Sequence, residues 1–330
     1  MQRSRILDAP DSRKIHRDHT PSLGGVPIFF SVAFALIVWI PEFSDQFKYL
    51  FAAATLMFVV GLRDDIVPLH PAVKLGSQLI PFVLLIGWAN FELTSFYDLI
   101  PGVEFPPIVV FLVTMFVFTV ITNAFNLIDG IDGLAGSLSL IAFTFYGVWF
   151  SLAGIHIAGL IAFAFVGGII AFLFFNWNPS KVFMGDTGAL LIGLVIAAFT
   201  ILFLNTNFAL ALNHPAKFQS GIGVAIAVII VPLTDTLRVF MLRISKGKSP
   251  FAADNNHIHH LLLQTGLSHA ATTSLLAMIN LSFVGLACIG QLWPSYLLVL
   301  TVAGLSISSV GTLTFVLKLR LKTQTQKAPV

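Results

Sequence analysis

The sequence predicts an all-α, polytopic integral membrane protein with about ten transmembrane helices and both termini in the cytoplasm. Three observations lead to this prediction. Of the 330 residues, 57% are hydrophobic and only 10% are charged, whereas soluble domains carry about 25% charged residues. The apolar residues form runs that are long enough to cross a bilayer, and the positive charges gather on one side of these runs.

Ten apolar runs are candidate spans, because a span needs roughly 20 residues or a few fewer. Backbone groups in lipid must be hydrogen-bonded within their own segment, so each run is expected to be a helix. The second run is short. The ten runs are 24–41, 48–62, 74–91, 107–125, 134–153, 155–175, 186–205, 218–240, 271–290 and 293–316.

The positive charges orient these spans. With the N-terminus inside and the sides alternating, all of the 18 lysines and arginines except Lys48 and Lys217 lie on the cytoplasmic side. Cytoplasmic segments of membrane proteins carry such an excess. We therefore expect one membrane-embedded domain over residues 1–330, with a histidine-containing cytoplasmic loop at 241–270. The single cysteine, Cys288, excludes an intramolecular disulfide and argues against a cysteine-based metal site.

Most polar motifs fall on the same membrane face. The sequences GLRDD, NLIDGIDG, FMGDTG, LTDTLR and DNNHIHH all lie in short cytoplasmic connections or in the helix turns beside them. An aspartate at the bilayer centre costs roughly 2.5–3.5 kcal/mol, and a place at the helix end lowers that cost. It does not explain why so many acids gather there, so we predict a functional site at this face.

The first motif holds an adjacent carboxylate pair, Asp64 and Asp65, after a short span. Such a pair is either a solvated helix end or a magnesium or general-base site. Two like charges this close raise one pKa, which suits a base.

The second motif, NAFNLIDGIDGLAG, repeats polar residues every three positions: Asn123, Asn126, Asp129 and Asp132. If the segment is helical, these residues share one face, and Gly130, Gly133 and Gly136 form a stripe beside it. Helix packing through small residues explains the glycines but not the acids and amides. Glycine also lets a ligand approach the backbone closely, so we expect a functional role.

The third motif, FNWNPSKVFMGDTGALLIG, places Asn176, Asn178, Lys181 and Asp186 before a span. Asp186, followed by Thr187, could simply cap that helix. The glycines on both sides of this pair favour the alternative, an oxygen ligand for Mg²⁺ near a substrate phosphate.

The longest inner loop runs from Arg243 to His269 and is basic before it turns polar. A short helix is expected, with Asp254 or Asn255 near its start and Gly266 after its end. It carries His257, His259 and His260. Zinc binding, a merely solvated loop, and donation to anionic phosphate or sugar oxygens are the three interpretations, and the last fits best because no cysteine accompanies the histidines.

Together these motifs resemble a known family. GLRDD, NAFNLIDGIDGLAG, FNWNPSKVFMGDTG and the HIHH loop are similar to those of the polyprenyl-phosphate N-acetylhexosamine-1-phosphate transferases, and DSRKIHRDHTPSLGG resembles that family's first cytoplasmic loop. The match runs in order from about Ser12 to His269. Each motif is modest alone, but five in order on one face are specific. DNNHIHH after KGKSPFAA resembles the branch that uses UDP-GlcNAc, since the peptidoglycan branch usually has three adjacent histidines.

The resemblance implies a reaction. GlcNAc-1-phosphate passes from UDP-GlcNAc to undecaprenyl phosphate on the cytoplasmic face of the bacterial inner membrane, and UMP leaves. The product would begin O-antigen (lipopolysaccharide), common antigen or teichoic acid linkage synthesis. UDP-MurNAc-pentapeptide, UDP-QuiNAc and UDP-FucNAc stay open as sugar donors, as does a homodimer. Membrane lipid is an expected partner, and nucleic acid is not.

The resemblance also implies roles for single residues. Asp64 would deprotonate or orient the lipid phosphate, unless an aspartate forms a covalent intermediate. Asp65 would support Asp64, and Asp65 and Asp186 would bind Mg²⁺, with Mn²⁺ as a substitute. The residues expected to bind substrate are Lys74, Asn123, Asn126, Asp129, Asp132, Asn176, Lys181, Arg243, His257, His259 and His260.

Two departures and one other class of protein accompany this interpretation. Family members usually begin with a further span before the RKIH loop, and Ala189 stands where a serine is common. Intramembrane acids also suit an ion-coupled transporter. Transport sites, however, lie near the midplane between related halves, whereas these acids gather at one face.

Overall fold

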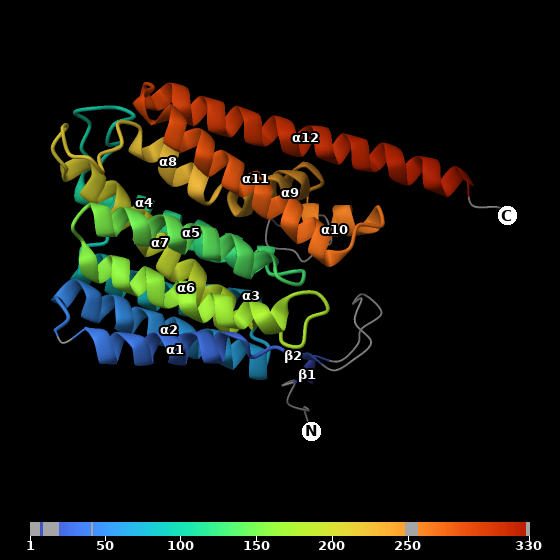
Figure 1. The fold of residues 1–330 in the computed structure, drawn as a ribbon, viewed down its shortest axis with the longest axis horizontal. Coiled ribbons are helices and arrows are strands. Elements are labelled where there is room, and N and C mark those ends of the chain that lie inside the picture. Colours follow the sequence, from blue (N-terminus) through green and yellow to red (C-terminus); the bar gives the residue numbers. More distant parts are fainter. Residues whose placement is uncertain (1–6, 9–19, 41, 248–256, 328–330) are drawn as a thin grey trace.

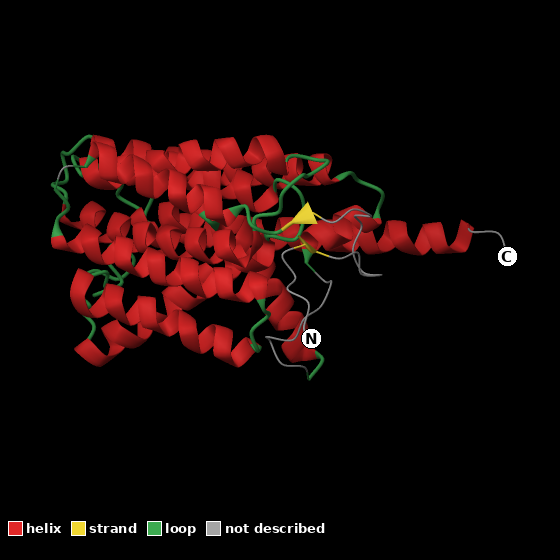
Figure 2. Ribbon diagram, turned by 90° about the horizontal axis from the view of Figure 1, so that it is seen from below, coloured by secondary structure: helices red, strands yellow, loops and turns green. Residues whose placement is uncertain are grey.

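The computed structural model describes residues 7–8, 20–40, 42–247 and 257–327. In these ranges the regular elements are helices and two strands of two residues each, joined by loops, so the all-α prediction is confirmed (Figures 1 and 2). The strands β1 (Leu7–Asp8) and β2 (Thr20–Pro21) pair antiparallel. The helices are α1 (Gly25–Trp39), α2 (Asp45–Ile66), α3 (Pro71–Ala89), α4 (Pro107–Ile128), α5 (Leu134–Leu152), α6 (His156–Asn176), α7 (Gly185–Ala209), α8 (Gly221–Val228), α9 (Ile230–Ser245), α10 (Ile258–Gln264), α11 (His269–Ile289) and α12 (Ser295–Lys327), with a 3₁₀ turn at Gly290–Leu292.

Each of the ten predicted spans coincides with a helix or a pair of helices. Seven helices of the described chain, α3 to α7, α11 and α12, are long and apolar enough to cross a membrane, and the number is eight if the bent pair α8–α9 counts as one span. The apolar helix α1 is shorter, with 15 residues, and α2 carries charged residues at both ends. The membrane class is therefore confirmed, while the count of ten and the side of each terminus stay predictions.

From its length we predicted that the run 218–240 is one continuous helix. The structure instead breaks it into two helices. The helices α8 and α9 meet at an angle of 77° near Ile229. Pro232 favours a break, because proline is tolerated in the first turn of a helix but not in its interior. The carboxamide of Asn280 on α11 accepts from Val231 N at 3.3 Å and donates to Val228 O at 3.0 Å. Another helix thus pairs the backbone groups that the break leaves open, as a bilayer requires.

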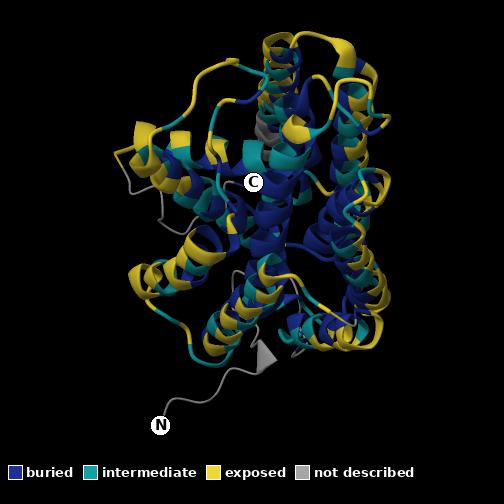
Figure 3. Ribbon diagram, turned by 90° about the vertical axis from the view of Figure 1, so that its left-hand side faces the viewer, coloured by how far each residue is buried: buried dark blue, intermediate teal, exposed yellow. Residues whose placement is uncertain are grey.

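The helix α7 forms the centre of the bundle, and 94% of its membrane-crossing stretch is buried. Buried ribbon occupies the middle of the bundle in Figure 3, with exposed residues around it. A helix that is apolar on all sides is expected to be buried in this way. Glycines let its neighbours approach: a Cβ on Gly25 of α1 would lie 2.1 Å from Gly188 N of α7. Small residues commonly permit such close packing in membranes.

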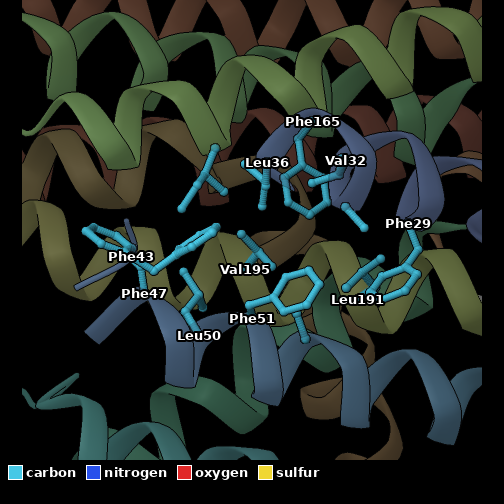
Figure 4. A pocket seen from close by; sticks show the side chains of 13 residues that line it. Phe29, Val32, Leu36, Phe43, Phe47, Leu50, Phe51, Phe165, Leu191 and Val195 are labelled. Atoms are coloured by element: carbon cyan, nitrogen blue, oxygen red, sulfur yellow. The ribbon is translucent and has the colours of Figure 1, made fainter. Parts of the chain in front are cut away.

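A small apolar pocket lies between α1, α2, α6 and α7. Apolar side chains line it, among them Phe29, Leu36, Phe47 and Phe165 (Figure 4). It contains no group that could perform acid–base or phosphate chemistry. The polar motifs lie instead where α2 and α4 end and α3 and α7 begin.

Candidate active site

Side chains from four helices meet around Asp186 in the first turn of α7. Asp186 Oδ1 accepts hydrogen bonds from Lys74 Nζ of α3 at 2.5 Å and from Asn126 Nδ2 of α4 at 2.5 Å. Lys74 Nζ also lies 2.8 Å from Asp64 Oδ2 of α2. Four residues that the sequence predicted as site residues, up to 122 positions apart in the chain, therefore form one cluster.

The Lys74 ammonium is held among oxygen atoms of three other residues: Asp64, Asn126, with Oδ1 at 3.4 Å, and Asp186. Asp64 is buried, and Leu69 N donates to its Oδ1 at 2.6 Å. The cluster thus carries two carboxylates and one ammonium in a sparsely hydrated position, where charge pairing is strong. It is built to hold positive charge.

These oxygen atoms suit Mg²⁺, which prefers carboxylate and carbonyl ligands. Among the described residues, no three His, Cys, Asp or Glu side chains are already spaced to hold a metal ion. The ammonium of Lys74 takes the position of a cation between the carboxylates of Asp64 and Asp186. The donor set therefore fits a hard cation, provided that Lys74 moves or shares its partners.

The carboxylate of Asp65 faces the start of α7 rather than Lys74. Its Oδ1 accepts from Asp186 N at 2.9 Å, and its Oδ2 accepts from Thr187 N at 2.9 Å and from Thr187 Oγ1 at 2.5 Å. Acidic side chains stabilise helix N-termini in this way. Asp65 therefore caps α7, which leaves the Asp186 side chain free to point at Lys74 and Asn126.

Gly185 makes this arrangement possible. Its φ is +71°, a conformation that side chains rarely adopt, and a Cβ there would lie 2.2 Å from Ser22 O and 2.7 Å from Asp65 Oδ2. The glycine before Asp186 thus allows Ser22, which follows β2, and Asp65 of α2 to approach the start of α7.

The polar stripe of the second motif is only partly formed. Asn126 joins the cluster. Asn123 lies one helical turn before it on α4, away from the cluster, and donates to Gln78 Oε1 at 3.1 Å and to Thr119 O at 2.8 Å. The helix α4 ends at Ile128, so Asp129 follows it as the C-cap. Burial and the negative charges of Asp186 and Asp65 raise the pKa of Asp129 to about 8. Asp129 thus lies near the cluster, and a cation bound there would stabilise its charged carboxylate form.

Asp132 and Asn176 hold loops. Asp132 Oδ2 accepts from Ser180 N at 3.2 Å and lies 3.3 Å from His269 Nδ1. Asn176 Oδ1 accepts from Gly133 N at 2.8 Å, and its Nδ2 donates to Val182 O at 2.8 Å. These bonds join the ends of α4 and α6 to α11.

Lys181 lies in the same loop and is exposed. It is the one predicted site residue of this motif whose side chain faces outward. The structure brings Lys181 into none of the three polar groups described in this section.

The histidines form the third polar group, around Asp235 of α9. His257 Nδ1 lies 2.9 Å from Asp235 Oδ2, and Ile258 N donates to Asp235 Oδ1 at 2.9 Å. The ring of His259 stacks on that of His257, with 5.5 Å between the ring centroids, and lies tilted against that of His260, with 4.3 Å between the centroids. We did not predict Asp235 as a site residue, although its motif LTDTLR lies on the predicted active face.

His259 joins this histidine group to the NLIDGIDG turn. A Cβ on Gly130 would lie 2.2 Å from His259 Nε2, so only a glycine admits the ring. Burial lowers the pKa of His259 to about 3, so the ring is neutral at physiological pH. The first glycine of the motif thus serves contact with a histidine.

Arg243 is buried in the last turn of α9, with its guanidinium 5.9 Å from the centre of the Phe240 ring. Residues 11–19 of the N-terminal motif, and Asp254 and Asn255, lie outside the described residues.

Comparison with known proteins agrees with this geometry. Residues 47–204, which contain the whole cluster around Asp186, match glycosyl transferase family 4. The chain is 30% identical over 295 residues to the undecaprenyl-phosphate alpha-N-acetylglucosaminyl 1-phosphate transferase of Yersinia pestis. The matched region covers 86% of this chain and 76% of that protein. The chain belongs to this transferase family. It is a membrane-bound phosphoglycosyl transferase, and the transporter alternative has no support.

Two further relatives carry similar names. The Escherichia coli K12 enzyme of the same name is 30% identical over 300 residues, or 87% of this chain and 76% of that enzyme. A probable undecaprenyl-phosphate N-acetylglucosaminyl 1-phosphate transferase of Bacillus subtilis is 30% identical over 284 residues, which are 84% of this chain and 75% of that protein.

Proposed function

We propose that this transferase moves GlcNAc-1-phosphate from UDP-GlcNAc to undecaprenyl phosphate on the cytoplasmic face of a bacterial inner membrane. An oxygen of the lipid phosphate bonds to the β-phosphorus, the bond from that phosphorus to the bridging oxygen breaks, and UMP leaves. The convergence of Asp64, Lys74, Asn126 and Asp186 at one end of the apolar helices carries this proposal. The substrates named for the relatives support the choice of sugar and lipid.

The site's place in the fold suits its two substrates. The lipid phosphate arrives along the bilayer and the nucleotide arrives from water, so both meet where the spans end. Phosphoryl transfer needs positioning and neutralisation of charge more than covalent help from the protein. An ammonium held between two carboxylates, beside a carboxamide, supplies such positioning.

Asp186 and Asn126 are the residues that would hold Mg²⁺, or Mn²⁺ in its place. When bound, the ion would neutralise charge on the diphosphate. Asp65 contributes by fixing the first turn of α7, since both of its oxygens accept from that turn. This assignment makes Asp65 a positioning residue rather than the metal ligand that the sequence led us to expect.

Lys74 and Asp64 divide the remaining work. The Lys74 ammonium donates to phosphate oxygens once substrate binds, and Asp64 holds Lys74 and accepts a proton from the lipid phosphate. Arg243 and the three histidines of the Asp235 group are donors of the kind that bind the sugar and diphosphate.

The test is UMP release from UDP-GlcNAc by the purified protein with undecaprenyl phosphate and Mg²⁺. Asp64→Asn and Asp186→Asn should abolish release, and a chelator should do the same. Asp45→Asn is the matched control, because Asp45 pairs with Lys48 in an exposed position at the other end of α2. Full activity in the Asp64 and Asp186 variants would refute the site assignment.

Two variations of this assay resolve the remaining alternatives. Offering UDP-MurNAc-pentapeptide, UDP-QuiNAc and UDP-FucNAc in place of UDP-GlcNAc tests the choice of sugar. Leaving out the lipid tests for a covalent intermediate, because attack by an aspartate would release one UMP per enzyme without any acceptor. Direct attack predicts no release until the lipid is added.

A further inference from the structure

A second polar pair joins α3 to α4 one helical turn deeper in the membrane than the Lys74–Asn126 contact. Asn123 Nδ2 donates to Gln78 Oε1 at 3.1 Å. Gln78 follows Lys74 by four residues and Asn123 precedes Asn126 by three, so each lies on the same helix face as its partner in the cluster. The two helices are therefore linked by two polar layers, an outer one and an inner one.

Packing alone does not explain the inner layer. Gln78 is fully buried, and its Nε2 has no hydrogen-bond acceptor among the described residues. A buried donor without a partner costs free energy, and an apolar pair of similar size would join the helices without that cost. The Gln78–Asn123 pair therefore provides something other than stability.

The backbone of α3 is weak at this level. Pro81 lies inside the helix, and a proline removes the hydrogen bond to the carbonyl four residues earlier, here that of Ser77. The first turns of α3, which carry Lys74, are thus less firmly joined to the rest of the helix. The bond from Asn123 falls at this point and attaches α3 to α4.

We propose that Gln78 and Asn123 are positioning residues for Lys74. Their amide pair fixes the rotation and height of the first turns of α3 against α4. It thereby sets where the ammonium lies among Asp64, Asn126 and Asp186. Asn123, which the sequence led us to expect at the substrate, acts through Lys74 instead. The catalytic consequence rests on the proposed function, but the placement of Lys74 does not.

The experiment compares Gln78→Leu, Asn123→Leu, the double variant, and the exchange Gln78→Asn/Asn123→Gln, which restores an amide pair. Activity is kcat for UMP release at saturating UDP-GlcNAc. Since a misplacement of about 1 Å can cost about 100-fold in rate, each single variant should lose roughly tenfold or more. The double variant should lose no more than the worse single variant, because both remove one bond. The exchange should recover most of kcat.

A second measurement does not depend on the reaction. Lys74 should react slowly with an amine-acylating reagent in the wild-type protein, faster in the Leu variants and slowly again in the exchange variant, as read by peptide mass spectrometry. Exposed Lys181 serves as the internal reference. Gln46→Leu is the matched control, because Gln46 donates to Ala89 O at the other end of α3, and it should alter neither reading.

The outcomes are distinct. If the wild-type protein releases no UMP, the proposed function fails, and Lys74 labelling still tests the placement. If the Leu variants keep kcat within twofold and label like wild type, the inference is overturned. A loss of kcat that the exchange does not restore, with unchanged labelling of Lys74, would overturn it as well, because the pair would then act on folding rather than on Lys74.

Discussion

Gly61→Ala tests whether the close approach of α2 to α7 sets the position of Asp186. A Cβ on Gly61 would lie 2.6 Å from Asp186 O, 2.6 Å from Thr187 Cα and 2.7 Å from Thr187 N. Ordinary contacts of a Cβ begin at about 3.4 Å, so the first turn of α7 must move by about 0.8 Å. That turn carries Asp186, and four residues after Gly61 lies its cap, Asp65.

The effect has two parts. Overpacking of this kind typically costs about 1–3 kcal/mol of stability. The displacement also lengthens the 2.9 Å bonds from α7 to Asp65 and moves Asp186 away from Lys74. A misplacement near 1 Å can lower a rate by about 100-fold. We therefore expect kcat to fall by roughly 10- to 100-fold, with a smaller change in melting temperature.

The assay is UMP release by the purified variant, together with its melting temperature in detergent. Gly76→Ala is the matched control: this glycine lies two residues after Lys74, and a Cβ there meets nothing within 4 Å. It should keep wild-type activity. Wild-type kcat in Gly61→Ala would refute the reasoning, because the turn that holds Asp186 would then tolerate the shift.

Three further predictions concern the surroundings of the site. Gly130→Ala should raise the KM for the UDP-sugar roughly tenfold, since its Cβ displaces His259 and overpacking costs about 1–3 kcal/mol. The control Gly87→Ala should leave KM unchanged, because a Cβ on Gly87 meets nothing within 4 Å. An equal KM in the two variants would contradict the role of the Gly130–His259 contact. Asp65→Asn should lower the free energy of unfolding by about 1.5–3 kcal/mol, as charge-assisted bonds to α7 are lost, and an unchanged melting temperature would show that the cap is dispensable. Burial lowers the pKa of His259 from 6.5 to about 3, so the stability that depends on its neutral ring is complete above pH 6.5 and is lost as the pH falls toward 3. His259→Gln should therefore flatten the acid-side decline of melting temperature, and a decline as steep as in the wild type would assign it to other groups.

The sequence predicted the helices and the gathering of the polar motifs at one end of them. Periodicity, length and charge placement are local properties, and they located Asp64, Asn126 and Asp186 at the ends of spans. The contacts between these residues follow from helix packing. Asp65 caps α7 through a bond to a residue 121 positions away. A local sequence pattern contains no information about such a distant partner.

The differences from prediction have similar causes. The three-residue repeat suggested a helix through Asp132, but α4 ends at Ile128 and Gly133 adopts a φ of +76°. The bend between α8 and α9 is supported by Asn280, from a helix far along the chain. The deep position of Asn123 depends on Gln78, a residue with no charge to mark it.

The burial of α7 has a consequence for how this protein is made. A helix so apolar can enter the bilayer by itself, and at that moment lipid surrounds it on every side. In the folded protein, neighbouring helices replace nearly all of that lipid. Where Gly25 of α1 meets Gly188 of α7, the two backbones are too close for lipid to lie between them. Only when α2 has displaced the lipid can Asp65 reach the start of α7. Assembly of the cluster around Asp186 therefore requires α2 and α7 to be packed against each other in the bilayer.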